Sequence, residues 1–225
     1  MKLSLETSEL CNYLSNQVNN FYPDKYVIKN EINQVLDIAI SRLEFCFKHV
    51  AFHRYNNEGN TIYNHLYADH HIMLLWFLSN VVWKELNNIN LASKLYYLNK
   101  TLHGVDCMYN TSMPDIFLIF HGVGTMLGKA HYDDYFVVLQ GCTIGSHKGE
   151  YPKFGKGVAL AANSSVIGNC VIGDRVSIST RTTLFQKNIE KDQTAFIDYG
   201  NGKLNIRQSN SCFAQNYFNV DLRDI

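Results

Sequence analysis

The chain has 225 residues, with 20 basic and 20 acidic side chains, so its formal net charge at pH 7 is zero. This balance, without a basic run, excludes a protein that binds nucleic acid or an anionic membrane surface by charge. The start, MKLSLETSEL, lacks the apolar segment of a secretory signal, and the longest apolar run, Ile72–Leu78, is too short to span a bilayer. The six cysteines are scattered without metal-binding spacing, which is typical of reduced thiols in a cytoplasmic protein.

The first helix is expected between residues 24 and 50, where apolar residues recur every three to four positions. Asp24 follows a proline and is the expected N-cap of this helix. Such a stripe is the face that a helix buries against a neighbour. The apolar residues of the stripe include Ile28, Ile32, Leu36, Ile40, Leu43 and Phe47.

Two more helices are expected over residues 66–86 and 91–102. The first of them is apolar nearly all round between Ile72 and Trp83, which indicates burial or a contact between subunits. The other stops at Gly104, and a polar, turn-rich loop precedes the pair. Helical periodicity therefore describes the chain up to residue 105.

From residue 106 to about 205 the period changes to six. Beginning at residue 154, the sequence divides into FGKGVA, LAANSS, VIGNCV, IGDRVS, ISTRTT and LFQKNI, each opening on a large apolar residue. This period is typical of a parallel β-helix, in which each unit is a short strand plus a turn and three units complete one coil. The first position points inward, and the fifth is mostly small or β-branched because it lies near a corner: Val158, Ser164, Cys170, Val176 and Thr182.

The same spacing continues backwards from Ile144, but out of phase with the later run by four residues. An insertion within residues 145–153 therefore interrupts the coil. The alternative, ordinary strands with coincidental spacing, does not account for so many apolar residues in one register. The expected inward residues are Phe120, Met126, Tyr132, Val138, Ile144, Phe154, Leu160, Val166, Ile172, Ile178 and Leu184.

Five stretches of the chain carry a family resemblance: LNKTLHGVD, HGVGTMLG, LQGCTIG, YPKFGKGV and SSVIGNCVIGDRVSI. Together they resemble the serine acetyltransferase branch of the hexapeptide-repeat acyltransferases. The resemblance implies an α+β fold in which an N-terminal α-helical domain, residues 1–105, precedes a left-handed parallel β-helix, residues 106–205. Residues 206–225 leave the repeat and form a C-terminal tail.

The resemblance also implies a site, with His121 as general base and Asp106, fifteen residues earlier, as the carboxylate that orients it. A neutral imidazole takes the hydroxyl proton as attack begins, and a carboxylate on its far nitrogen fixes the tautomer. Since Phe120 is expected to point into the coil, His121 is expected to point out of it. A histidine packed in the core, or exposed without a role, is the alternative.

Departures from the family pattern bear on the acceptor. Phe120 stands where the family has an aspartate that helps to bind the amino acid substrate. Tyr151 replaces the family's second histidine, Glu150 replaces the arginine before it, and the loop is shorter. Because a missing polar partner changes discrimination strongly, the acceptor need not be serine. The candidate acceptor-binding residues are Phe120, Tyr151 and His147.

The positions that resemble the family's coenzyme groove are better preserved. In the family the pantetheine arm lies between neighbouring coils, where small residues allow close approach. Arg181 or Lys148 could meet the phosphates, or either could be solvated surface. The candidate acetyl-CoA-binding residues are Gly145, Ser146, Lys148, Ala161, Ala162, Ser179 and Arg181.

A cluster of possible metal ligands lies at the start of the second expected helix: His65, Asp69, His70 and His71. At helical spacing His65 and Asp69 share a face, while the other two point elsewhere. The resemblance implies no metal. We therefore expect a structural or interface role for the cluster.

The sequence thus predicts an acetyl-CoA-dependent O-acetyltransferase that resembles serine acetyltransferase and acts on serine or a related hydroxyl compound. One alternative changes the acceptor to a sugar of a surface-polysaccharide precursor, on whose apolar face Phe120 could stack. Another is a catalytically degenerate scaffold, against which the retained Asp106 and His121 argue. The resemblance further implies a homotrimer or a dimer of trimers with sites between subunits. It also suggests docking of the terminal Ile225 into a cysteine-synthesising partner enzyme.

Overall fold

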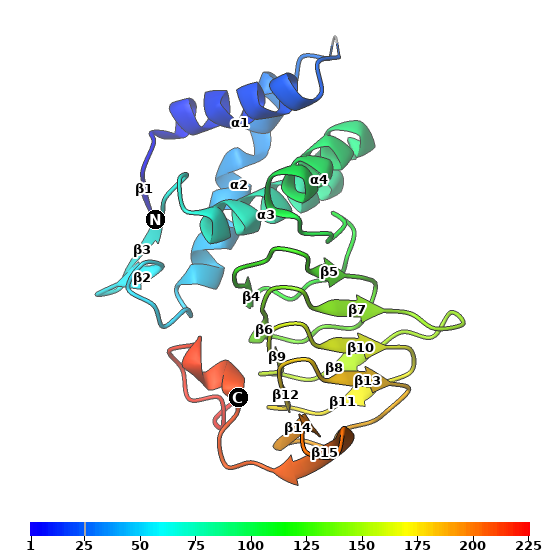
Figure 1. Ribbon diagram of the computed structural model, residues 1–225. Helices are drawn as coiled ribbons and strands as arrows, with labels where there is room; N and C mark the ends of the chain where they lie inside the picture. The colour runs from blue at the N-terminus through cyan, green and yellow to red at the C-terminus, as the bar shows by residue number, and fades with distance from the viewer. Residues whose placement is uncertain (25) are drawn as a thin grey trace.

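The computed structural model describes residues 1–24 and 26–225 and shows a helical part stacked on a column of short strands (Figure 1). Within these residues, no helix has the length and apolar character needed to cross a membrane. The helices are α1 (Thr7–Phe21), α2 (Lys29–Phe47), α3 (Ala68–Leu86) and α4 (Ile89–His103). A small sheet of order β1-β3-β2 accompanies them, formed by β1 (Lys2–Leu3), β2 (Asn56–Asn57) and β3 (Asn60–Tyr63).

The predicted helices are confirmed, with shifted ends. The helix predicted from residue 24 begins after Ile28, which occupies the N-cap position, so the assignment of Asp24 as N-cap is wrong. Asp24 instead accepts hydrogen bonds from the backbone N–H of Tyr26 and from the ammonium group of Lys94. The last helix ends at Gly104, whose φ of 67° is the left-handed conformation that favours glycine at a helix end.

Helix α3 is apolar all round because it lies at the centre of the chain's own core. It packs against α2, α4 and β4, and its residues from 69 to 82 are all buried. Trp76 meets Phe117 of β4 edge-on, which joins the helical part to the first coil. Of the two alternatives predicted for Ile72–Trp83, the structure therefore shows burial within the chain.

The remaining strands form a parallel β-helix with three faces. The first face has the order β15-β14-β12-β9-β6-β4, the second β13-β10-β7-β5, and the third β11-β8. The expected fold, a helical part followed by a β-helix, is therefore confirmed. The strands are β4 (Phe117–Ile119), β5 (Met126–Leu127), β6 (Phe136–Val138), β7 (Thr143–Gly145), β8 (Lys153–Phe154), β9 (Ala159–Leu160), β10 (Ser165–Ile167), β11 (Val171–Ile172), β12 (Ser177–Ile178), β13 (Thr183–Phe185), β14 (Gln193–Asp198) and β15 (Lys203–Gln208).

Stacked apolar side chains fill the interior of the coil. Each fully buried leucine, isoleucine or valine stabilises the fold by about 1.5–3 kcal/mol relative to an exposed one. The small residues predicted for the fifth positions are also fully buried. The first face stacks Ile119, Val138, Leu160, Ile178 and Ala195. The second stacks Leu127, Ile144, Val166 and Leu184, and the third Phe154 and Ile172, with Tyr132 on Phe154.

The predicted register is wrong in the first coil. Ile119 and Leu127 hold the inward positions that the six-residue period assigned to Phe120 and Met126. Met126 is 47% exposed, and Phe120 lies beyond the end of β4. The reason is that Ile119 and Leu127 are eight residues apart, two more than the repeat, while Leu127 and Tyr132 are five apart, one fewer. The corner that holds His121 is therefore a bulge in the coil.

The predicted insertion after β7 is confirmed as a hairpin-like loop. The backbones of His147 and Glu150 pair, and Lys148 and Gly149 form the turn with φ values of 51° and 81°. Two successive positive φ values are typical of the tight turns that join paired strands. The loop projects from the side of the column, next to β7 (Figure 1).

An antiparallel hairpin, β14–β15, ends the coil, and the sequence did not predict it. The chain then turns through a short 3-10 helix, η1 (Phe213–Asn216), and runs back to the helical part, where the carbonyl of Tyr217 accepts the N–H of Ala51. Phe218 forms a bridge with Val50 and is buried. The tail is thus a packed element of the fold.

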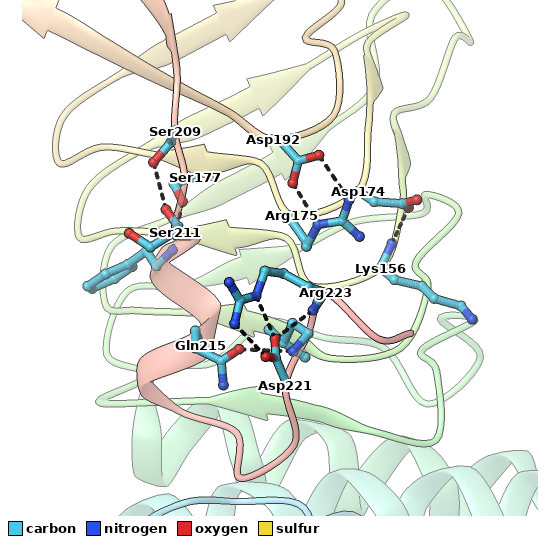
Figure 2. A network of polar contacts seen from close by, with 12 residues as sticks. Lys156, Asp174, Arg175, Ser177, Asp192, Ser209, Ser211, Gln215, Asp221 and Arg223 are labelled. Atoms are coloured by element: carbon cyan, nitrogen blue, oxygen red, sulfur yellow. Dashed lines mark hydrogen bonds and ion pairs between the residues drawn. The ribbon is translucent and has the colours of Figure 1, made fainter.

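Polar contacts hold the tail and the last coils (Figure 2). Arg175 donates two hydrogen bonds to Asp192, at 2.6 and 2.9 Å, and so links two neighbouring coils. The hydroxyl of Ser177 accepts the first N–H of η1 at 2.8 Å. In the tail, Arg223 pairs with Asp221. Of these contacts, the hydrogen bond from Phe213 to Ser177 joins the tail to the coil.

Candidate active site

His121 lies at the bulged corner between β4 and β5, with its side chain 61% exposed. It is outside the coil, as expected. Its φ of 54° lies in the left-handed region, as do those of Asn163 and Arg181 at the same corner of later coils. Gly122 follows it, and a Cβ there would lie 2.7 Å from a side-chain carbon of Val105 and 2.8 Å from one of Ile119. The backbone beside the histidine is therefore pressed against the core.

The carboxylate beside His121 belongs to Asp69, in the first turn of α3. Its Oδ1 accepts the backbone N–H of His121 at 3.0 Å, and its Oδ2 is 3.5 Å from Nδ1 of the ring. Burial raises the pKa of Asp69, while His121 and its N–H act to lower it. The sequence places Asp69 among possible metal ligands but gives no sign of this contact, which joins residues 52 positions apart.

Among the described residues, the contacts of the Asp106 side chain are with Tyr96 and Lys100 and not with His121, as its predicted role would require. Its Oδ1 accepts the hydroxyl of Tyr96 and its Oδ2 accepts Nζ of Lys100, each at 2.7 Å. Burial acts to raise the pKa of Asp106, but the hydrogen bonds from Lys100 and Tyr96 outweigh it, and the pKa is lowered. The carboxylate faces α4 and not the corner after β4. Its contacts fasten the last helix to the first coil.

The other members of the histidine cluster have structural contacts. His65 precedes α3, with its Nδ1 2.8 Å from the hydroxyl of Ser4, so its predicted shared face with Asp69 is wrong. His70 and His71 are buried, which lowers the pKa of each to about 3. They are neutral at physiological pH. In the described ranges, no three His, Cys, Asp or Glu side chains converge on a metal position.

An aromatic cluster borders His121 on its other side. The ring of Phe120 stacks on Phe52 and meets Tyr217 of the tail edge-on, with 5.4 Å between ring centres in both pairs. Its centre is 4.1 Å from that of the His121 ring. Phe52 and Tyr217 lie outside the repeat, so no periodic signal could assign them to the site. The corner thus has apolar rings on one side and a single carboxylate on the other.

The candidate coenzyme and acceptor residues fall on two different corners of the coil. The backbone ladder of the first face continues past its strands, since the N–H groups of Phe120 and Ala161 donate to Val138 and Ile178. The residues at the same corner as His121 are Ala161, Ala162, Ser179 and Arg181. Those at the next corner, on or beside the inserted loop, are Gly145, Ser146, His147, Lys148 and Tyr151. His147 packs there against Phe185, 4.8 Å between ring centres.

The architecture is thus a helical part followed by a parallel β-helix of six-residue repeats, with an exposed histidine at one corner. Among curated proteins, the chain is similar to the serine acetyltransferase of Buchnera aphidicola subsp. Baizongia pistaciae (strain Bp). The two are 25% identical over 194 residues, which cover 77% of this chain and 71% of that protein. No family model matches the chain.

Solved structures of serine acetyltransferases share the fold. The enzyme from Brucella abortus strain S19 superposes with a TM-score of 0.69 at 15% identity, over 92% of this chain and 85% of that one. The enzyme from Neisseria gonorrhoeae gives 0.68 at 18% identity, over 91% and 80%. A serine acetyltransferase in complex with CoA gives 0.68 at 18% identity, over 90% and 85%. The predicted resemblance to serine acetyltransferases is thereby confirmed.

Proposed function

We propose that this protein is an acetyl-CoA-dependent O-acetyltransferase in which His121 takes the proton of a hydroxyl acceptor. The observation that carries the proposal is the exposed imidazole at the bulged corner of the β-helix. It occurs in a chain similar to a serine acetyltransferase over 194 residues. Solved serine acetyltransferases in complex with CoA and with cysteine support a site in this chain for the coenzyme and a small acceptor.

The proposed reaction transfers the acetyl group directly. With Nδ1 of His121 facing Asp69, the free Nε2 takes the proton from the acceptor hydroxyl. The acceptor oxygen attacks the thioester carbonyl, and the tetrahedral oxyanion is stabilised by backbone N–H donors. Collapse of this intermediate breaks the carbon–sulfur bond, and the sulfur leaves with the proton held by the imidazolium. The products are an acetyl ester and free CoA.

We further propose that a second copy of the chain completes the site. The candidate residues of one chain occupy two different corners, so His121 and the inserted loop do not form one site within it. A trimer about an axis parallel to the coil brings the first corner of one copy to the second corner of the next. Sedimentation analysis should give a mass of three or six chains, and a monomer active at assay concentrations would contradict this arrangement.

Two kinds of acceptor are candidates for this reaction. Serine is the first candidate because it is the acceptor named by the relatives. The stacked pair Phe52 and Phe120 favours a second candidate, a sugar hydroxyl, because aromatic rings pack well on the apolar face of a sugar ring. Docking of Ile225 into a partner enzyme stays a prediction, and it requires release of a tail that packs on this chain.

The test is release of free CoA thiol from acetyl-CoA with serine, homoserine and a set of sugars and nucleotide sugars. Loss of a general base should lower the rate by about 10²–10⁴-fold in His121→Ala. His49→Ala is the matched control, since this histidine lies just after α2, with its Nδ1 on the carbonyl of Phe45. Full activity of His121→Ala would refute the mechanism. Absence of both transfer and CoA binding by calorimetry would favour the scaffold alternative.

A further inference from the structure

We propose that Asp69 is the positioning carboxylate of His121, in the role that the sequence assigns to Asp106. The inference rests on the proposed function, because it concerns how the base of that reaction is held. Asp69 lies on α3, in the helical part, whereas His121 lies on the β-helix. The helical part therefore supplies one half of the pair that performs the chemistry.

Two contacts from one carboxylate fix both the backbone and the ring of His121. The bond from the His121 N–H to Oδ1, 3.0 Å long, holds the residue in its left-handed conformation. Oδ2 lies 3.5 Å from Nδ1, so the tautomer with the proton on Nδ1 is favoured, and the lone pair of Nε2 is directed to the acceptor. Such contacts commonly tighten when substrate binds.

The carboxylate has no competing partner in the described part of the chain. The side chain of Asp69 is 5% exposed, and its Oδ2 is buried without a hydrogen bond. The ionisable groups close to it are His121 and the hydroxyl of Tyr55, whose pKa is raised mainly by burial and further by Asp69. The tyrosine is therefore neutral. Protonation of His121 during the reaction is the event that compensates the buried charge.

Asp69→Asn separates this role from a purely structural one. The amide oxygen still accepts the N–H of His121, so the amide nitrogen must face Nδ1 of the ring. An amide there donates a hydrogen bond and shifts the ring proton to Nε2, which can no longer act as a base. We expect kcat to fall by about 10²–10⁴-fold with a smaller change in KM. Asp174→Asn is the matched control, because Asp174 likewise accepts a backbone N–H, that of Lys156 at 2.9 Å.

Two further readouts distinguish a positioning role from loss of folding. Nitrogen-15 spectra of the imidazole should report the Nδ1–H tautomer in the wild type and the Nε2–H tautomer in Asp69→Asn. Asp69→Glu, which keeps the charge, should recover part of the rate.

The spectra keep this inference distinguishable from the proposed function. If the wild type transfers no acetyl group, the proposed function fails, and the tautomer still decides whether Asp69 and His121 form the pair. An unchanged tautomer in Asp69→Asn would overturn the inference. So would a larger loss of kcat in Asp106→Asn than in Asp69→Asn.

Discussion

Replacing Asp106 by asparagine should destabilise the fold. The carboxylate accepts one charged and one neutral donor, Lys100 and Tyr96, at 2.7 Å each. The side chain of Asp106 is 25% exposed and that of Lys100 is 47% exposed. Because solvent screens the ion pair, it contributes about 0.5–1 kcal/mol to the free energy of unfolding. The amide oxygen still accepts one hydrogen bond, so that the net loss in free energy of unfolding at pH 7 is about 1 kcal/mol.

The sign of the pH dependence follows from the lowered pKa of Asp106. A carboxylate whose pKa is lower in the folded state contributes stability above its unfolded pKa, about 3.9, and loses it as the pH falls through the folded value. The difference in free energy of unfolding between wild type and Asp106→Asn should therefore be largest at pH 7 and decrease below about pH 4.

Urea unfolding at pH 7 and pH 3.5 measures this difference, at one fixed protein concentration because subunit association adds to stability. Lys100→Met is the matched variant, and it should lower the free energy of unfolding at pH 7 by about as much as Asp106→Asn. The double variant should lose less free energy of unfolding than the two single variants lose together. Equal unfolding midpoints at pH 7, or a difference that does not depend on pH, would refute the structural role of Asp106.

Three further predictions follow from the core, the corner and the tail. Leu160→Ala removes a fully buried side chain from the stack of the first face and should lower the free energy of unfolding by about 2–5 kcal/mol in urea titrations. Gly122→Ala forces a methyl group against Val105 and Ile119, so it should lower the free energy of unfolding by about 1–3 kcal/mol. It should also lower kcat, because the displaced segment carries His121. Unchanged kinetics would contradict the placement of the corner. Tyr217→Ala removes the edge-on contact with Phe120 and should speed tryptic cleavage at Arg207, followed by mass spectrometry, whereas an unchanged rate would show that the polar contacts alone hold the tail.

Periodicity predicted the architecture because the repeat is a local property of the sequence. Inward positions such as Leu160 and Ile178 recur at a fixed interval and pair directly in neighbouring coils. The interval fails around β5, where a step of five residues from Tyr132 back to Leu127 and one of eight back to Ile119 put Ile119 in the place predicted for Phe120. An insertion between two apolar neighbours leaves the period ambiguous by one position, so the sequence could not reveal this bulge.

The candidate site was predictable only in part, because its members are far apart in the chain. His121 stands out through the family motif, and its exposed position agrees with that assignment. Asp69 and Tyr217 reach the same corner from α3 and from the tail, which depends on tertiary packing. Asp106 has the spacing to His121 that the family shows, but its carboxylate accepts hydrogen bonds from Lys100 and Tyr96 on α4. The spacing along the chain predicted the position of Asp106, but it could not predict the direction of its side chain.

The most direct measurement of the proposed chemistry is the rate of acetyl ester formation with acetyl-CoA, followed by mass spectrometry of the acceptor, in wild type and His121→Ala. We expect a product with one added acetyl group and a rate lower by about 10²–10⁴-fold in the variant, while His49→Ala keeps the wild-type rate. Equal rates for wild type and His121→Ala would contradict the role of His121 as the general base.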